Sequence, residues 1–378
     1  VPTPKSYFGR YEMTSQFEGA ERIAEKWGIS REDTDAFGLL SQQRAIKAWE
    51  EDRFAGQIVE VDAPDLDEEG KPTDTTHRVT KDEGLRETSL VGAGVVDVAV
   101  ACGVESMSRV PIGSNSKGDY GRPIPKTYFP HYEFTSQFEG AERIAEKWGI
   151  TRDETDAFGL LSQQRAAEAW AQDAFGSQLV AVDAPDLGED GKPTGSTHRV
   201  ERDEGLRETT LEALQGLKAV AREDGVHTAG TSSQISDGAA AVLIATREKA
   251  EALGLTPRAR IVDTCLVGSD PVLMLTGPID ATHHLLERNS MQMSDIDLVE
   301  INEAFASVVL AWERELKPDM ATVNPNGGAI ALGHPLGGTG AILTTKAVHE
   351  LERSDLSTAL VTMCCGGGLA TGTLLERA

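Results

Sequence analysis

The chain has 378 residues, and its 61 Asp and Glu side chains outnumber its 36 Lys and Arg side chains, which gives a formal net charge of −25. This acidic balance argues against nucleic acid or an anionic membrane as the main partner, because both are bound through basic surfaces. A hydrophobic share of 39% and a charged share of 26% are ordinary for a globular protein of about two or three domains.

Cysteine content and apolar runs exclude further classes of protein. The four cysteines of so long a chain form no disulfide framework, and their spacing matches no metal site. The longest apolar run, Val91 to Val104, is interrupted by Asp97 and is too short to span a bilayer, and the first residues contain no apolar signal core. We therefore expect a cytoplasmic protein without membrane insertion.

An internal repeat dominates the first half of the chain. Residues 5–90 recur as residues 126–211, with 63 identities in 86 aligned positions. Both copies contain one identical string, which runs from Thr14 to Ile29 and again from Thr135 to Ile150. Two copies at so long a spacing are one module present twice rather than a solenoid.

In each copy the apolar pattern predicts two helices followed by an irregular segment that carries a strand. In the first copy, Phe17, Ile23 and Trp27 recur at helical spacing, Gly28 ends that helix, and Ser30 caps the next. Residues 58–61 alternate apolar and acidic side chains, which predicts a short strand, and residues 65–74 are expected to form an acidic loop. We interpret the tryptophans of these helices as packing residues rather than a ligand cage: Trp27, Trp49, Trp148 and Trp170.

The rest of the chain alternates strands and helices. Two dense apolar runs, Val95 to Ala101 and Ala239 to Ile244, predict buried strands. Further strands are expected at residues 259–265, 296–301, 359–363 and 371–375, and helices at residues 279–288, 303–315 and 340–351. This alternation predicts an α/β fold with a mostly parallel sheet covered by helices, which binds ligands beyond the carboxyl ends of its strands.

Three polar motifs lie where these strands are expected to end. Asn302, at a change from strand to helix, can cap the helix or hold a water or carbonyl oxygen, and Glu303 in the first turn would favour the helix dipole. His334 is flanked by glycines that permit close approach of a ligand, and histidine suits acid–base chemistry near neutral pH. Cys364 is either a small buried thiol or a reactive one, followed by glycines from Gly366 on whose N–H groups could form an oxyanion hole. Together the motifs indicate acyl-thioester chemistry.

These motifs resemble those of the thiolases, the 3-ketoacyl-CoA and acetoacetyl-CoA thiolases. The resemblance rests on residues 302–305, 333–335, 364–368 and 103–108, and it covers residues 91–378 continuously. It implies a layered α-β-α-β-α fold with an incomplete N-terminal half. The implied parts are an extra α-rich copy of the loop domain at 1–90, a remnant of the N-terminal domain at 91–107, the CoA-binding loop domain at 108–230, a return segment at 231–256 and the C-terminal domain at 257–378.

The resemblance also implies a role for each candidate residue. His334 would activate the nucleophile and help hold the thioester oxygen, and Asn302 would position a water in the same oxyanion hole. Cys364 would exchange the proton of the substrate α-carbon, and the N–H of Gly366 would serve a second oxyanion hole. Ser233 would contact the pantetheine of coenzyme A. Coenzyme A and acyl-CoA are then substrates, no metal or permanent cofactor is implied, and a homo-oligomer is expected.

The chain departs from the thiolase pattern at the cysteine that becomes acylated. In the family this cysteine precedes the segment that matches Gly103 to Ser108, but residues 5–90 contain no cysteine. Cys102 is a possible substitute, although it lies in a strand-end motif where the family carries a small residue. Cys365 is expected to face away into packing.

Two explanations for this architecture remain open. Either a recombined or mis-assembled gene placed a loop domain where the nucleophile segment belonged, or the chain is a divergent protein that binds acyl-CoA without thiolysis. The resemblance implies acyl transfer between a 3-ketoacyl-CoA and coenzyme A, in either direction, in lipid or steroid side-chain metabolism. The alternatives are acyl-CoA binding without turnover and residual proton exchange at the α-carbon.

Overall fold

The computed structural model describes residues 16–29, 44–45, 47–48, 53, 61–66, 72–79, 98–114, 128–188 and 192–378. The chain divides into two compact units, residues 1–97 and 98–378, and each is described by itself. The predicted features at Ser30, at Trp49 and at residues 91–97 lie outside the described residues.

The described part of the first unit contains one complete helix, one hairpin and helical residues at 44–45 and 47–48, where the second helix of this copy is expected. Helix α2 (Gln16–Trp27) confirms the predicted helix, and Gly28 follows it with the positive φ of 64° that glycine adopts readily. Strands β1 (Val61–Leu66) and β2 (Pro72–Val79) pair in antiparallel fashion.

The hairpin corrects the prediction of a loop at residues 65–74, because residues 65–66 and 72–74 belong to its strands. Residues 58–60 of the strand predicted at 58–61, and residues 67–71, lie outside the described residues. The hairpin recurs in the second copy. There β4 (Val182–Leu187) pairs with β5 (Pro193–Val200), and the N–H of Gly188 donates to the carbonyl of Lys192 at 2.8 Å to close the turn. Period-two alternation missed these strands because the residues of β5 are almost all exposed, so neither face needs to be apolar.

The second copy of the module begins with two capped helices. Helix α4 (Gln137–Trp148) starts at Ser136, whose hydroxyl accepts from the N–H of Glu139, and it ends at Gly149 with a φ of 63°. Helix α5 (Arg152–Ala171) starts with a capping box between Thr151 and Glu154. Local capping chemistry therefore fixes both helix starts.

A four-stranded sheet in the order β7-β10-β9-β8 forms the centre of the second unit. Its strands are β7 (Ala259–Gly268), β8 (Leu298–Ile301), β9 (Thr358–Cys364) and β10 (Leu369–Arg377). Only β8 and β9 are parallel, so the prediction of a mostly parallel sheet is wrong. A turn of four residues joins β9 to β10, and so short a connection permits only antiparallel pairing.

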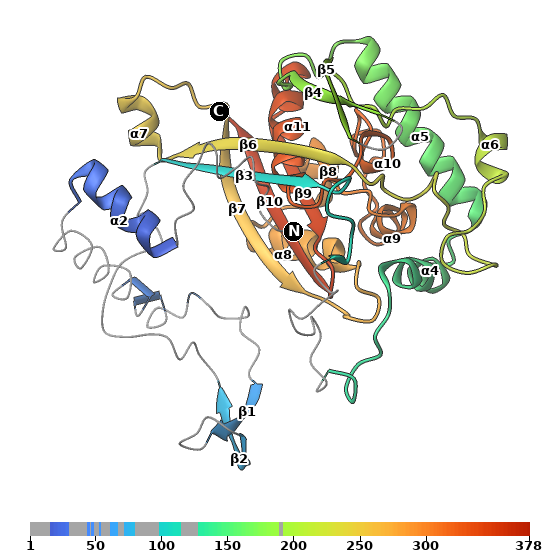
Figure 1. Cartoon of the computed structure of the whole chain (residues 1–378). Helices are drawn as coiled ribbons and strands as arrows, with labels where there is room; N and C mark the ends of the chain where they lie inside the picture. The colour runs from blue at the N-terminus through green and yellow to red at the C-terminus, as the bar shows by residue number, and fades with distance from the viewer. Residues whose placement is uncertain are drawn as a thin grey trace. The chain divides into compact units, whose positions relative to one another are not determined.

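Helices cover both faces of this sheet (Figure 1). Leu360 of β9 packs in one cluster with Leu285 of α8 (Gly277–Arg288), whereas its neighbour Val361 packs in another with Leu343 of α11 (Thr339–Arg353). Because successive strand residues point to opposite faces, α8 and α11 lie on opposite sides.

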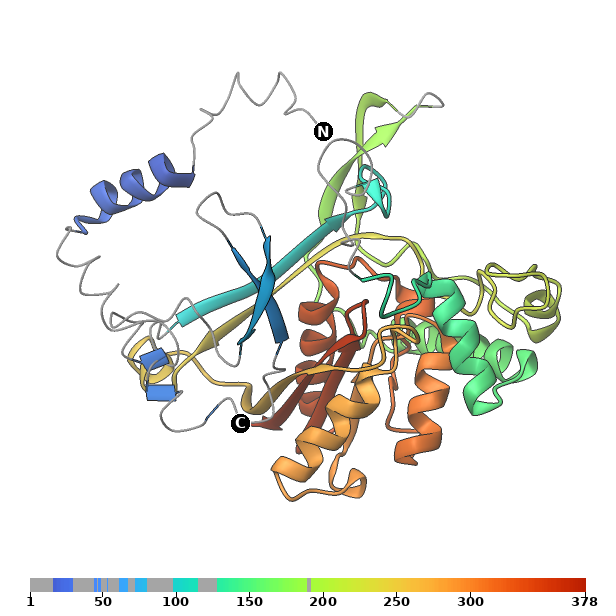
Figure 2. The same cartoon turned by 90° about the horizontal axis from the view of Figure 1, so that it is seen from below.

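Helix α11 also contacts a separate ribbon of two antiparallel strands, β3 (Val98–Ser106) and β6 (Asp237–Ala245). Figure 2 shows these two long strands running side by side. Helix α8, the four-stranded sheet, helix α11 and the ribbon thus form four successive layers. Strand β3 continues past the predicted end at Ala101, because Cys102 and Gly103 still pair with Ala241 and Ala240.

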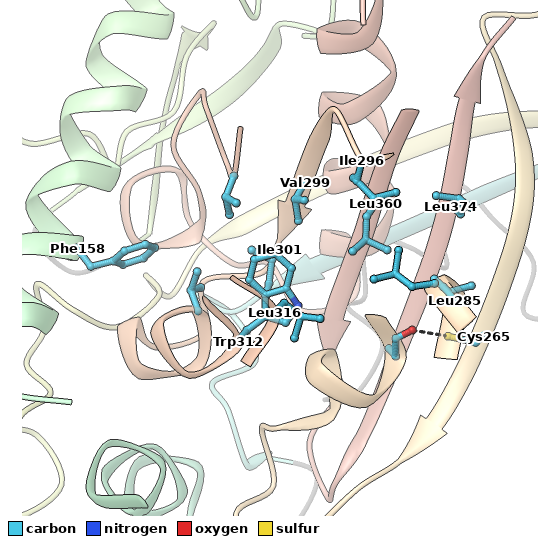
Figure 3. Packing of buried hydrophobic residues seen from close by; sticks show 14 of the residues in the cluster. Phe158, Cys265, Leu285, Ile296, Val299, Ile301, Trp312, Leu316, Leu360 and Leu374 are labelled. Atoms are coloured by element: carbon cyan, nitrogen blue, oxygen red, sulfur yellow. Dashed lines mark hydrogen bonds between the residues drawn. The ribbon is translucent and has the colours of Figure 1, made fainter. Parts of the chain in front are cut away.

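The largest cluster of buried apolar residues lies between the sheet, α8 and α9 (Ala306–Leu316) (Figure 3). Fully buried Trp312 donates from its indole N–H to the hydroxyl of Thr282 at 2.9 Å, and the Cys265 thiol lies 3.6 Å from the carbonyl of Ala281. Phe158 of α5 belongs to the same cluster, so the repeated module in this unit is built into the core.

Short elements complete the described structure: α6 (Leu211–Gln215), α7 (Arg247–Ala252), the 3-10 helix η2 (Met293–Asp295) and α10 (Ala329–Leu332). Among the described helices, none has the length and apolar content needed to cross a membrane.

Candidate active site

Asn302 and His334 lie together at the end of β8. The strand stops at Ile301, but the N–H of Asn302 still donates to the carbonyl of Thr362 on β9 at 3.1 Å. The Asn302 side chain is buried, and its Nδ2 lies 3.4 Å from Nε2 of His334. Its Oδ1 is also buried and has no hydrogen-bond partner in the described part of the chain. This free acceptor faces no protein donor, which is typical of a site that holds a ligand.

The predicted helix start at Asn302 is wrong. Helix α9 begins at Ala306, preceded by Phe305 in an extended conformation, and residues 302–305 form a loop. Glu303 is therefore not in a first helical turn. Its side chain instead accepts hydrogen bonds from Ser162, Asn324 and Ile330, which are distant in the chain. These tertiary contacts override the local preference of the sequence for helix.

The backbone that carries His334 has a conformation that requires glycine. Gly333 has a φ of 95°, and a Cβ there would lie 2.1 Å from Oγ of Ser236. The backbone N–H of His334 then donates to the carbonyl of Gln234 at 3.0 Å. This tight turn thus places the imidazole next to Asn302, and the turn itself packs against Ser236.

Hydrogen bonds assign the tautomer of the His334 ring. The Thr339 hydroxyl donates to the carbonyl of Pro335 at 2.9 Å, so it accepts from Nδ1–H of His334, 2.7 Å away. Nε2 therefore presents its lone pair towards Asn302. Burial lowers the pKa of His334 to about 4, so the ring is neutral at pH 7.

Cys364 is the last residue of β9, and Cys365 follows it in a different environment. Cys364 is buried in an apolar cluster with Ala304 and Phe305. Burial, and secondarily the neighbouring Cys365, raises the pKa of its thiol to about 12. Cys365 is exposed, so the prediction that it faces into packing is wrong. It lies one residue beyond β9, where the chain turns out of the sheet.

The turn after these cysteines leaves open space. Gly366 and Gly367 have φ angles of 69° and 64°, and a Cβ on either would meet nothing within 4 Å. Gly368 differs, because a Cβ there would lie 2.8 Å from the carbonyl oxygen of Ser269. Glycine is thus required at 366 and 367 by backbone conformation alone, and a ligand has room to approach Gly366.

Ser233 lies on a segment that runs between the loops that carry Asn302 and His334. The N–H of Ser233 donates to the carbonyl of Ala304 at 3.0 Å, and that of Gln234 to Ala329 at 3.3 Å. The loop at residues 302–305 thus contains Asn302 and contacts His334, Ser233 and Cys364. Gly366 follows two residues after Cys364.

The motif at residues 103–108 contacts the turn that follows His334. A Cβ on Gly103 would lie 1.6 Å from the carbonyl oxygen of Gly337, and the N–H of Gly337 donates to Glu105 at 3.1 Å. Ser106 and Ser108 donate from their hydroxyls to Asp237 on β6 at 3.1 Å and 2.5 Å. Gly103 and Glu105 thus hold the turn after His334, and the two serines attach this segment to β6.

Two buried carboxylates beside the site were not identified from the sequence as site residues. Glu303 accepts hydrogen bonds from Ser162, Asn324 and Ile330. Glu300 pairs with Nζ of Lys346 at 2.7 Å, and Nζ also donates to the carbonyl of Gly327 at 2.6 Å. Burial, opposed by Lys346, raises the pKa of Glu300 to about 7. For Glu300, the only sign in the sequence of a special role was a charged residue within an apolar strand.

The matching family models and the related proteins are all thiolases. The model for the thiolase N-terminal domain matches residues 10–91 and again residues 86–248, and the thiolase C-terminal domain matches residues 255–377. A steroid 3-ketoacyl-CoA thiolase of Mycobacterium tuberculosis is 47% identical over 293 residues, which cover 75% of this chain and 69% of that protein. A 3-ketoacyl-CoA thiolase of Bacillus subtilis is 43% identical over 288 residues, 75% of this chain and 72% of that one.

Among solved structures, human mitochondrial 3-ketoacyl-CoA thiolase in complex with CoA matches with a TM-score of 0.63 and 37% identity, over 75% of this chain and 71% of that one. These comparisons place the chain among α/β acyltransferases that act on CoA thioesters. The chain belongs to the thiolase family.

Proposed function

We propose that this chain is an acyltransferase of the thiolase type, acting on 3-ketoacyl-CoA and coenzyme A in thiolysis or in the reverse Claisen condensation. The observation that carries the proposal is the Asn302–His334 pair, 3.4 Å apart, next to a buried cysteine and an open glycine turn. Relatives named for 3-ketoacyl-CoA substrates, one of them a steroid thiolase, support the lipid or steroid substrate class.

The protonation states suit this chemistry. Neutral His334 can take a thiol proton at Nε2, and Asn302 Nδ2 can donate to a thioester oxygen. When the bond between the α- and β-carbons breaks, its electron pair stays on the α-carbon, and the protonated Cys364 thiol can supply the proton. Gly366 would offer its N–H to the oxygen of that thioester, and Ser233 would contact the pantetheine.

The domain assignment follows from the repeat. Residues 1–90 would be an extra loop domain, followed by an N-terminal remnant at 91–107, the CoA-binding loop domain at 108–230, the return segment at 231–256 and the C-terminal domain at 257–378. The two separate matches of the N-terminal family model support this division. The assembly would be a cytoplasmic homo-oligomer, which light scattering can test.

A second candidate function is acyl-CoA binding with α-proton exchange but without thiolysis. It is favoured by the cysteine content, since residues 5–90 contain none and Cys102 is exposed on β3. Without an acylated cysteine the two-step reaction has no covalent intermediate, and loss of a nucleophile costs on the order of a million-fold in rate.

Thiolysis assays with acetoacetyl-CoA and a longer 3-ketoacyl-CoA separate the two candidates. Trapping with a reactive acyl-CoA analogue, followed by peptide mapping, identifies any nucleophile. The acyltransferase should give thiolysis and an adduct on Cys102 or Cys364 that turns over when coenzyme A is added. The second candidate should give α-proton exchange with neither thiolysis nor a stoichiometric adduct.

A further inference from the structure

We infer that Glu303 is a positioning residue for the Asn302–His334 pair, and that Ser162 of helix α5 ties this carboxylate to the CoA-binding part of the chain. The inference rests on the proposed function and adds to it a residue that acts through the pair without touching substrate.

Three donors converge on the buried Glu303 carboxylate. Oε1 accepts from Nδ2 of Asn324 at 2.9 Å. Oε2 accepts from the Ser162 hydroxyl at 2.6 Å and from the backbone N–H of Ile330 at 3.2 Å. One carboxylate thus joins helix α5, the loop before α10, and α10 itself to the end of β8.

Each of these donors is itself held in place. Asn324 donates to the carbonyl of Ile301 at 2.8 Å and accepts from its N–H at 2.9 Å. The Ser162 hydroxyl also accepts from the N–H of Gly328 at 3.2 Å. A Cβ on Gly328 would lie 2.3 Å from the carboxyl carbon of Glu303, so the carboxylate can approach only because this residue is glycine.

The segment fixed in this way leads directly to His334. Ile330 belongs to α10, the single helical turn that ends at Leu332, and only Gly333 separates this turn from His334. Glu303 also follows Asn302 in the chain. The carboxylate therefore fixes both members of the pair, one through the backbone next to it and the other through α10.

Glutamine cannot replace this carboxylate, although it has nearly the same shape. An amide offers one acceptor oxygen and would turn a donor towards one of the three donors already present. Alanine at position 162 is milder, because it leaves Oε2 with one donor and deprives the Gly328 N–H of its acceptor.

The test compares Glu303→Gln and Ser162→Ala with a matched control, Glu142→Gln. Glu142 is equally buried and also accepts from three donors, namely the N–H groups of Val226 and His227 and the His227 ring. None of these residues hydrogen-bonds to the Asn302–His334 pair in the described structure. Three quantities are measured: the ring pKa of His334 by NMR, exchange of acetyl-CoA α-protons in D2O at saturating substrate, and the thermal unfolding midpoint.

Glu303→Gln should raise the ring pKa of His334 from about 4 towards its usual value, as the ring becomes more solvated. It should reduce saturated exchange about 100-fold, the effect of a misplacement near 1 Å. Ser162→Ala should reduce exchange about tenfold, the equivalent of one lost hydrogen bond. Glu142→Gln should lower the unfolding midpoint while leaving the His334 pKa and the saturated rate within about twofold.

A His334 pKa that is the same in wild type, Glu303→Gln and Ser162→Ala would overturn the inference, as would equal rate losses in the control. If wild type shows no exchange at all, the proposed function fails, and the NMR measurement still decides the role of Glu303. If Glu303→Gln does not fold, Ser162→Ala decides by the same criteria.

Discussion

The helices α2 and α4 have identical sequences but different surroundings. In α4, Ile144 is completely buried, and Ile150 just beyond the helix is 4% exposed. The corresponding residues in the first copy, Ile23 and Ile29, are 54% and 42% exposed. The same sequence is therefore helical in both copies, but it does not determine what the helix buries.

The second copy shows what an α2-like helix packs against when it is buried. Helix α4 contacts α9, and the hydroxyl of Ser307 donates to the carbonyl of Ala141 at 3.0 Å. Glu142 accepts from the N–H groups of Val226 and His227. An isolated helix of this length is marginal in water, so these tertiary contacts supply most of the stability of α4.

The largest expected difference in stability between the two copies comes from a charge placed at Ile144 and at the matching Ile23. Ile144→Asp buries an unpaired carboxylate against α9 and should destabilise residues 98–378 by about 4 kcal/mol or more. Ile23→Asp, its matched control, should change stability by less than about 0.5 kcal/mol, as surface substitutions do. Urea unfolding of both variants measures the difference, and equal effects would mean that α2 is buried as well.

The pH dependence of stability should be a property of the second unit. Glu300 there has its pKa raised from 4.5 to about 7, so between these values the folded state binds more protons than the unfolded state. The contribution of Glu300 to stability therefore falls as pH rises through this window, by about 3 kcal/mol in total. His334 opposes it between about pH 4 and 6.5, because its lowered pKa makes the folded state bind fewer protons than the unfolded state. The difference in unfolding free energy between wild type and Glu300→Gln, measured at each pH, should therefore fall between pH 4.5 and 7. A difference that does not change with pH would contradict the assignment to Glu300.

The two matching tryptophans should differ by the smallest amount. Trp148 donates from its indole N–H to Glu315 at 2.7 Å and packs against the α4–α9 cluster, whereas Trp27 is 62% exposed. Trp148→Phe should cost about 1–2 kcal/mol, and Trp27→Phe less than about 0.5 kcal/mol. Acrylamide should quench the fluorescence of Trp27 more strongly than that of Trp148, and equal quenching would contradict the difference in burial.

Local sequence patterns predicted most elements of the second unit, because buried faces there repeat at the helical or strand period. Helix α8 and strand β7, for example, lie within three residues of their expected bounds. The strand directions were not predictable from alternation alone, since they depend on whether a turn or a helix connects the strands. The packing interpretation of tryptophan fits Trp148, but Trp27 is exposed.

For the candidate site, the sequence identified the residues at strand ends but not what holds them. The side chains of Asn302 and His334 lie next to each other in space, as the motifs suggested. Glu303 was assigned to a helix because an acidic residue after a strand suits a first turn, whereas its partners Ser162 and Ile330 are distant in sequence. Cys365 was expected to be buried, and its exposure follows from the exact end of β9, which sequence alone does not define.

Exchange of the α-protons of acetyl-CoA in D2O, followed by mass spectrometry, tests the proposed site most directly. We expect measurable exchange by the wild-type chain and loss of that exchange in His334→Ala and in Cys364→Ala. Exchange that survives both substitutions would contradict the assignment of the site to Asn302, His334 and Cys364.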